Sequence, residues 1–113
     1  MQDAFSNVVD QDLEGLTNLF RLLADKTRLN ILLLLAEREF NVSQLCEELS
    51  LPQPTVSHHL GLLRISQLID NRRLGKQVYY ALNGRVICPD GGRCLDISVG
   101  SRFVRISARD EAA

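Results

Sequence analysis

Four polar side chains of modest length open a predicted helix over residues 53–65. They belong to Gln53, Thr55, Ser57 and His58, and each offers hydrogen-bond donors or acceptors. Side chains of this type can reach the edges of base pairs in the major groove of DNA. We therefore identify this helix face as a candidate base-reading surface.

A second group of side chains could bind phosphate without reading sequence. These are the basic residues Arg64, Arg72, Arg73 and Lys76. Residues 53–85 carry five basic and one acidic side chain, whereas residues 1–52 carry nine acidic and four basic ones. Residues 86–113 carry four of each, so the net charge of −1 conceals a local positive excess. Local charge governs attraction to phosphate, and this asymmetry favours a nucleic-acid partner.

Thiols form the third group. The chain has three cysteines, Cys46, Cys88 and Cys94. Cys88 and Cys94 flank a loop rich in glycine, so they could close a disulfide or bind a thiophilic metal ion. Two thiols do not complete a tetrahedral zinc site unless a second chain or Cys46 contributes. Three unrelated cysteines are the remaining interpretation, and we assign no metal site.

Two further features bear on metal binding. Cys46 falls on the apolar face of its predicted helix, which favours a small buried hydrophobe over a ligand. His58 and His59 are adjacent in a helix and point about 100° apart, so they cannot easily hold one ion. We expect His58 to face DNA and His59 to be partly packed.

The elements that must position these groups follow from the spacing of apolar residues. Helical periodicity extends over residues 12–23, 26–37, 42–49 and 53–65. Asp25 is placed to cap the second of these helices. In the last helix Val56, Leu60 and Leu63 are expected to face inward. β-branched and aromatic residues then predict strands over 67–73 and 77–82, with a turn at Gly75.

Two short helices joined at Pro52 and followed by a basic hairpin predict a winged helix–turn–helix, a mostly α fold with a small β-hairpin. We expect a flexible arm at residues 1–11, the DNA-binding domain at 12–84, and a C-terminal extension at 85–113. The extension holds the cysteine loop and a short strand over 102–107. The domain is expected to contact double-stranded DNA.

The first predicted helix carries more apolar surface than one neighbouring helix can bury. Its apolar side chains include Leu13, Leu16, Leu19 and Phe20. We therefore expect a symmetric homodimer that uses these residues, with help from the C-terminal segment.

Three segments resemble the ArsR-type (arsenic-repressor-like) family of transcriptional regulators. Residues 19–32, LFRLLADKTRLNIL, are similar to its opening signature. Residues 53–60, QPTVSHHL, with Leu62, Leu63 and Arg64, look like its recognition helix, and residues 72–80, RRLGKQVYY, like its wing. The resemblance covers residues 13–83. It implies a homodimeric repressor that binds operator DNA and leaves it when an inducer binds.

The sequence departs from this family at two places. Pro52 stands where the family has a capping serine, a loss worth roughly 1 kcal/mol. The metal-binding box of the family, Glu-Leu-Cys-Val-Cys-Asp-Leu, corresponds to residues 39–45, where Asn41 and Ser43 replace both cysteines. A response to thiophilic ions or oxidants would then fall to Cys88 and Cys94, and less to Cys46.

Other functions fit the sequence less well. The sequence contains neither a nucleophile–base pair nor a glycine-rich phosphate loop, the features that would indicate an enzyme. A winged-helix module that binds only proteins would not need four basic side chains that can reach phosphate. A constitutive repressor, or a repressor that senses thiol oxidation, remains an alternative. The longest apolar run, residues 31–36, is far shorter than the roughly 20 residues that span a bilayer, and no signal peptide is evident. We expect a cytoplasmic protein without membrane contact.

Overall fold

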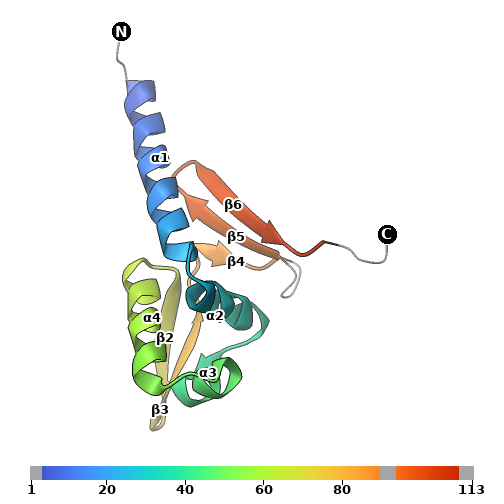
Figure 1. Cartoon of the computed structure of the whole chain (residues 1–113). Coiled ribbons are helices and arrows are strands. Elements are labelled where there is room, and N and C mark those ends of the chain that lie inside the picture. Colours follow the sequence, from blue (N-terminus) through green and yellow to red (C-terminus); the bar gives the residue numbers. More distant parts are fainter. Residues whose placement is uncertain (1–3, 90–93, 110–113) are drawn as a thin grey trace.

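The computed structural model describes residues 4–89 and 94–109, with residues 4–10 described by their backbone. In this part of the chain, four helices accompany two small antiparallel sheets (Figure 1). The helices are α1 (Ala4–Leu23), α2 (Lys26–Glu37), α3 (Val42–Leu49) and α4 (Gln53–Ile65). The strands are β1 (Phe40–Asn41), β2 (Ile69–Leu74), β3 (Gln77–Leu82), β4 (Val86–Ile87), β5 (Cys94–Val99) and β6 (Arg102–Ser107). None of the described helices has the length and apolar character needed to cross a membrane.

Helices α2 to α4 and the sheet β1–β3–β2 form the predicted winged helix–turn–helix unit. The three helices span the residues that the sequence predicts, and β3 does so as well. Strand β2 begins two residues later than predicted, at Ile69. The short strand β1, which the sequence did not predict, pairs Phe40 with Tyr80 and so joins the start of α3 to the hairpin.

Local hydrogen bonds explain where these helices begin. Asp25 Oδ1 accepts a hydrogen bond from the Arg28 amide at 3.0 Å, which caps α2 as expected. Asn41 and Gln44 form a reciprocal capping box on α3, with bonds of 2.8 and 2.9 Å. Pro52 makes no side-chain bond at the start of α4. The first turn of α4 therefore lacks the side-chain cap that α2 and α3 have.

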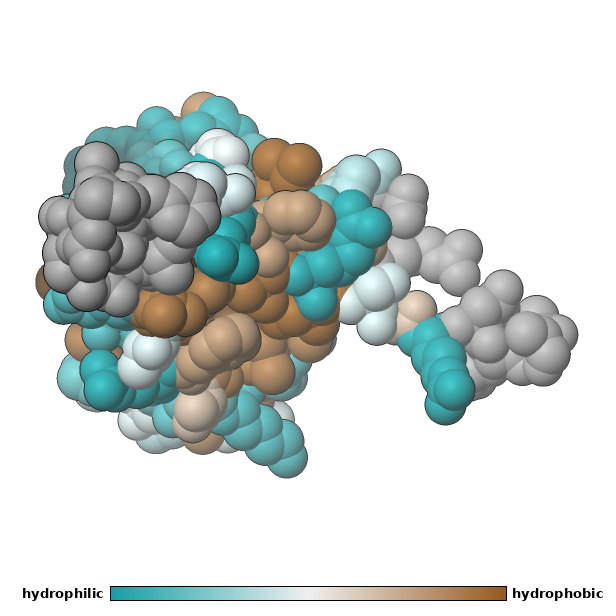
Figure 2. Space-filling model, turned by 90° about the horizontal axis from the view of Figure 1, so that it is seen from above, coloured by the Kyte–Doolittle hydropathy of each residue, from teal (hydrophilic) through white to brown (hydrophobic). Residues whose placement is uncertain are grey.

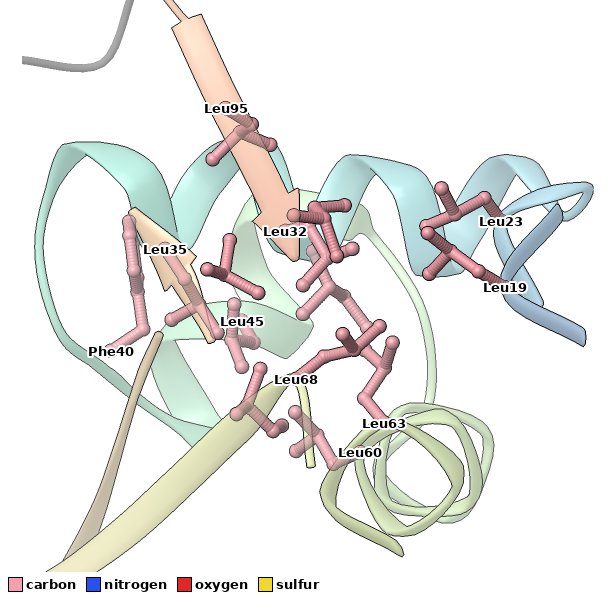
Figure 3. Packing of buried hydrophobic residues seen from close by; sticks show 14 of the residues in the cluster. Leu19, Leu23, Leu32, Leu35, Phe40, Leu45, Leu60, Leu63, Leu68 and Leu95 are labelled. Atoms are coloured by element: carbon pink, nitrogen blue, oxygen red, sulfur yellow. The ribbon is translucent and has the colours of Figure 1, made fainter. Parts of the chain in front are cut away.

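A buried apolar cluster joins the helices to both sheets (Figure 3). Helix α4 contributes Val56, Leu60 and Leu63, each at most 1% exposed, as predicted from their spacing. The C-terminal strand β5 contributes Leu95 and Ile97 to the same cluster. The segment that follows the hairpin is thus part of the core and does not form an appendage.

The C-terminal extension forms a second sheet of order β4–β5–β6. Strand β6 matches the predicted short strand, but β4 and β5 were not predicted. Cys94 was expected in a loop and instead begins β5, while residues 90–93 lie outside the described residues. Strand β5 alternates buried Leu95, Ile97 and Val99 with more exposed positions, because one face of the sheet packs on the core.

Helix α1 begins at Ala4, well before the predicted start at residue 12. Residues 4–11, for which the sequence predicted a flexible arm, form its first turns. No proline or glycine in this stretch interrupts the helix. Residues 1–3 lie outside the described residues.

The turn between β5 and β6 is fastened to α1. Asp12, buried in α1, accepts a hydrogen bond from the Ser101 hydroxyl at 2.5 Å and lies 3.7 Å from Arg102 Nε. Gly100 adopts a left-handed conformation (φ 58°) beside the Asp12 carboxylate. Gly15 allows a close approach, because a Cβ atom there would lie 2.8 Å from Val99 Cγ1. These contacts hold α1 against the β5–β6 turn, although the two segments are far apart in the sequence.

We predict that Gly100→Ala destabilises the fold more than Gly75→Ala. Both glycines have positive φ, which costs an alanine about 1 kcal/mol. A Cβ at Gly75 would meet open space, whereas one at Gly100 would collide with the Asp12 carboxylate. Displacing that buried acceptor should add about 1–3 kcal/mol. Urea unfolding followed by circular dichroism measures the difference, and equal losses would contradict the proposed fastening.

Candidate nucleic-acid interface

Helix α4 has one buried and one exposed face. Gln53, Thr55, Ser57 and His58 are all exposed, opposite the buried stripe of Val56, Leu60 and Leu63. The four polar side chains thus share the outer surface of the helix, as the sequence predicts. Their contact with DNA stays a prediction.

His59 belongs to a different environment from His58. It is half-buried, and its Nδ1 lies 3.2 Å from Nη1 of Arg28. Arg28 also donates to the Leu22 carbonyl at 2.7 Å and therefore links the end of α1 to α2 and α4. Arg28 is a positioning residue that sequence reasoning missed, because its partners lie on three different elements.

The β2–β3 hairpin, which we call the wing, has a basic tip. Gly75 supplies the positive φ of the turn, and Arg73 and Lys76 beside it are exposed. Neither side chain makes an ion pair or hydrogen bond with any described residue. Arg64, exposed at the last turn of α4, is likewise without such a partner among the described residues. These cations are available to a phosphate backbone.

Arg72 differs from these three cations, because it already forms an ion pair with an acidic side chain. Its Nε and Nη2 donate to the two carboxylate oxygens of Glu39 at 2.7 and 2.9 Å. This bond holds the pKa of Glu39 below its ordinary value and raises the pKa of Arg72. Arg72 is thus tied to the segment before β1. Its predicted role as a phosphate contact is weaker than that of Arg73.

Arg85, too, makes hydrogen bonds within the fold. Its Nε donates to the Ser98 carbonyl at 2.7 Å and its Nη1 to the Ser66 carbonyl at 2.8 Å. It contributes to the local positive charge but connects the end of α4 to β5. Of the five bases in residues 53–85, three therefore remain unpaired within the described structure.

The candidate sensor residues are spread over the fold. Asn41, in place of a family cysteine, caps α3, and Ser43 is exposed. Cys46 is half-buried on α3, Cys88 is half-buried after β4, and Cys94 is buried at the start of β5. Among the described residues no group of three or more potential ligands could hold a metal ion.

The predicted dimer residues divide into two sets. Leu13 and Phe20 are 52% and 53% exposed, and Leu16 is half-buried. Leu19 is only 4% exposed and packs in the core of its own chain, so it has little surface for a partner. We call Leu13, Leu16 and Phe20 the dimer stripe. Seen from above, a continuous apolar area occupies the middle of this face of the molecule (Figure 2).

Comparison with known sequences identifies relatives of this chain. The family model described as "Bacterial regulatory protein, arsR family" matches residues 25–70. The chain is 46% identical over 63 residues to the HTH-type transcriptional regulator KmtR of Mycobacterium tuberculosis, covering 56% of this chain and 48% of KmtR. It is 49% identical over 69 residues to the arsenical resistance operon repressor of Escherichia coli, covering 60% of this chain and 59% of the repressor. The chain thus spans about half to three-fifths of these two relatives.

Two further comparisons cover more of the related protein. The transcriptional repressor SdpR of Bacillus subtilis is 33% identical over 72 residues, which are 64% of this chain and 80% of SdpR. The solution structure of Mb0332 from Mycobacterium bovis has a TM-score of 0.61 and 29% identity, covering 82% of this chain and 79% of that chain. It is described as a homodimeric winged helix-turn-helix DNA-binding domain.

These findings confirm the predicted fold and the resemblance. The matched family model describes a regulatory protein and the matched relatives are named regulators or repressors, which agrees with the prediction of a regulatory domain in place of an enzyme. The chain belongs to the arsR family of bacterial regulatory proteins.

Proposed function

We propose that this protein is a homodimeric transcriptional repressor that binds double-stranded operator DNA through α4 and the wing. The observation that carries the proposal is the two-sided character of α4. Its apolar stripe is fully buried, while Gln53, Thr55, Ser57 and His58 are exposed. In the wing beside them, Arg73 and Lys76 make no ion pair with a described residue. A helix presented in this way can enter the major groove, and the wing can reach the backbone or the adjacent minor groove.

The two sets of side chains have different tasks in this proposal. Short polar groups on α4 form hydrogen bonds with base edges, which distinguish one sequence from another. Arg64, Arg73 and Lys76 bind phosphate, which contributes affinity and register for every sequence. Arg28 and His59 hold α4 at a fixed angle to α2, so that the polar face keeps its direction.

Thr55→Ala and His58→Ala test the base-reading role. Each should weaken binding to the operator by roughly 1–3 kcal/mol if it removes a good base contact, and leave non-specific binding nearly unchanged. Fluorescence anisotropy with the DNA upstream of the protein's own gene and with a scrambled duplex gives both affinities. Equal losses on both duplexes would remove these residues from the base-reading set. Absence of binding to any DNA would favour a protein-interaction module.

The wing supplies a matched comparison in the same titrations. Arg73→Ala and Lys76→Ala should weaken binding to all sequences and each flatten the salt dependence by about one phosphate contact. Arg72→Ala should have a smaller effect on the slope, because Glu39 already neutralises that guanidinium. If all three variants keep the wild-type slope, the wing does not contact DNA.

The dimer in this proposal forms through the dimer stripe of α1 and the edge strand β6. Asp12 and Gly15 face the β5–β6 turn, so Leu13 and Phe20 lie on a flank of α1 that the described residues leave exposed. Val104 and Ile106 lie on the core face of the sheet by register, opposite Ile97 and Leu95, yet are only half-buried. Their uncovered surface supports a contribution from the C-terminal segment.

We predict that Phe20→Asp converts the dimer into a monomer. The side chain is 53% exposed, so a charge there does not disturb the core of one chain but would be unpaired in an apolar interface. Gln11→Asp, an exposed position on the same helix, is the control and should leave the dimer intact. Sedimentation velocity at micromolar concentration distinguishes the states. A wild-type monomer, or a Phe20→Asp dimer, would contradict this interface.

For a response to thiophilic metal ions or oxidants, we propose Cys88 and Cys94 as the responding thiols. They flank the connection between β4 and β5, and β5 is joined to the end of α4 through Arg85. A disulfide or bound ion at this connection would strain that link and so lower operator affinity. Cys46 lies on α3, away from this link.

The corresponding experiment compares Cys88→Ser/Cys94→Ser with Cys46→Ser. Hydrogen peroxide or a thiophilic ion should release wild type and Cys46→Ser from the operator but not the double variant. Anisotropy with and without each agent measures release. Equal release of all three proteins would exclude the loop thiols, and no release of wild type by any agent would exclude thiol sensing.

A further inference from the structure

A cavity lies between α1, the end of α4 and the residue that leads into β4. It has a volume of about 260 Å³. Its polar lining comes from Asn18, Ser66 and Arg85, and its apolar lining from Leu19, Leu22 and Leu68. We call it the Arg85 pocket. Asn18 and Leu22 lie on the flank of α1 opposite Leu13 and Phe20.

The polar groups of the pocket are mainly donors. Arg85 uses Nε and Nη1 on the Ser98 and Ser66 carbonyls, and its Nη2 has no acceptor among the described residues. Asn18 Oδ1 accepts from Arg21 Nη1 at 3.1 Å, which leaves the amide NH₂ of Asn18 as a donor. The Ser66 hydroxyl makes no hydrogen bond within the described structure.

Charge and size define what the pocket can hold. It contains a guanidinium and no acidic side chain among its lining residues, so it favours an anion. Three leucines supply apolar walls, which an inorganic ion would not use. The volume lies just below the roughly 300–1,000 Å³ of pockets for drug-sized ligands. The combination fits a carboxylate on a short hydrocarbon body.

We propose that the Arg85 pocket binds a small organic carboxylate, and that this ligand lowers the affinity of the protein for its operator. The carboxylate accepts from Arg85 and from the Asn18 amide, and the hydrocarbon body lies against the leucines. The effect on operator affinity rests on the proposed DNA-binding function. Ligand binding itself does not.

The coupling to α4 runs through Ser66. Ser66 is the C-cap of α4, its carbonyl accepts from Arg85, and Gln67 follows with a positive φ of 62°. A carboxylate competes with the Ser66 carbonyl for the guanidinium, because a charged acceptor binds arginine more strongly than a neutral one. Weakening that bond loosens the end of α4 from β5. Operator affinity falls to the extent that the ligand binds the loosened state more tightly.

Binding is tested on the free protein by NMR titration with acetate, butyrate and hexanoate, and with 1-hexanol as the uncharged counterpart. Butyrate and hexanoate should bind at millimolar concentration and shift the Arg85 Nε–H and Ser66 amide signals, while 1-hexanol should not. Asn18→Asp keeps the shape and the Arg21 bond but adds an anion at the pocket, and should weaken hexanoate binding at least about tenfold. Asn30→Asp, the same change at an exposed position of α2, is the control.

Two results would overturn the binding site: no binding by any carboxylate, or equal binding by Asn18→Asp and Asn30→Asp. Operator affinity with and without hexanoate is measured separately by anisotropy. Hexanoate that binds wild type without changing operator affinity would overturn the regulatory effect. A protein that binds no DNA would contradict the proposed function, and the NMR titration would still decide the site.

Discussion

The burial of one stripe of α4 is the interaction on which the rest of the structure depends. Val56, Leu60 and Leu63 are removed from water almost completely, and each such burial stabilises the fold by about 1.5–3 kcal/mol. Because α4 has no side-chain cap at Pro52, this packing largely holds the helix. The same burial forces Thr55, Ser57 and His58 outward. A helix that reads DNA must be fixed by packing on one face and accessible to the bases on the other. The buried stripe of α4 fixes the helix and leaves its polar face accessible.

Contacts within the fold then determine which basic side chains can bind the phosphate backbone of DNA. The net charge of −1 would disfavour DNA if it were evenly spread. Arg72 is neutralised by Glu39, and Arg85 keeps its charge but is held at two backbone carbonyls, so the cations free to approach a phosphate are Arg64, Arg73 and Lys76. Few phosphate contacts imply a modest salt dependence. Specificity in this protein therefore depends more on α4 than on bulk charge.

The sequence predicted the elements with strong local signals. Asp25 and Pro52 mark the starts of α2 and α4, and the period of the leucines sets their buried faces. Contacts between residues that are far apart in the sequence left no pattern from which they could be predicted. Glu39 and Arg72 are 33 positions apart, and Asp12 and Ser101 are 89 apart, so their bonds could not be predicted from spacing. Strand β4 has two residues, too few for a periodic pattern, and β5 directly follows a segment rich in turn residues.

The most direct measurement of the central claim is methylation protection of guanine N7 in the DNA upstream of the protein's own gene. N7 lies in the major groove, so it reports where α4 binds. A symmetric dimer with one α4 in each half-site should protect two clusters of guanines about 10–10.5 base pairs apart, or a multiple of that spacing. Protection of a single cluster, or bound protein without any protected guanine, would contradict a homodimer that reads DNA through α4.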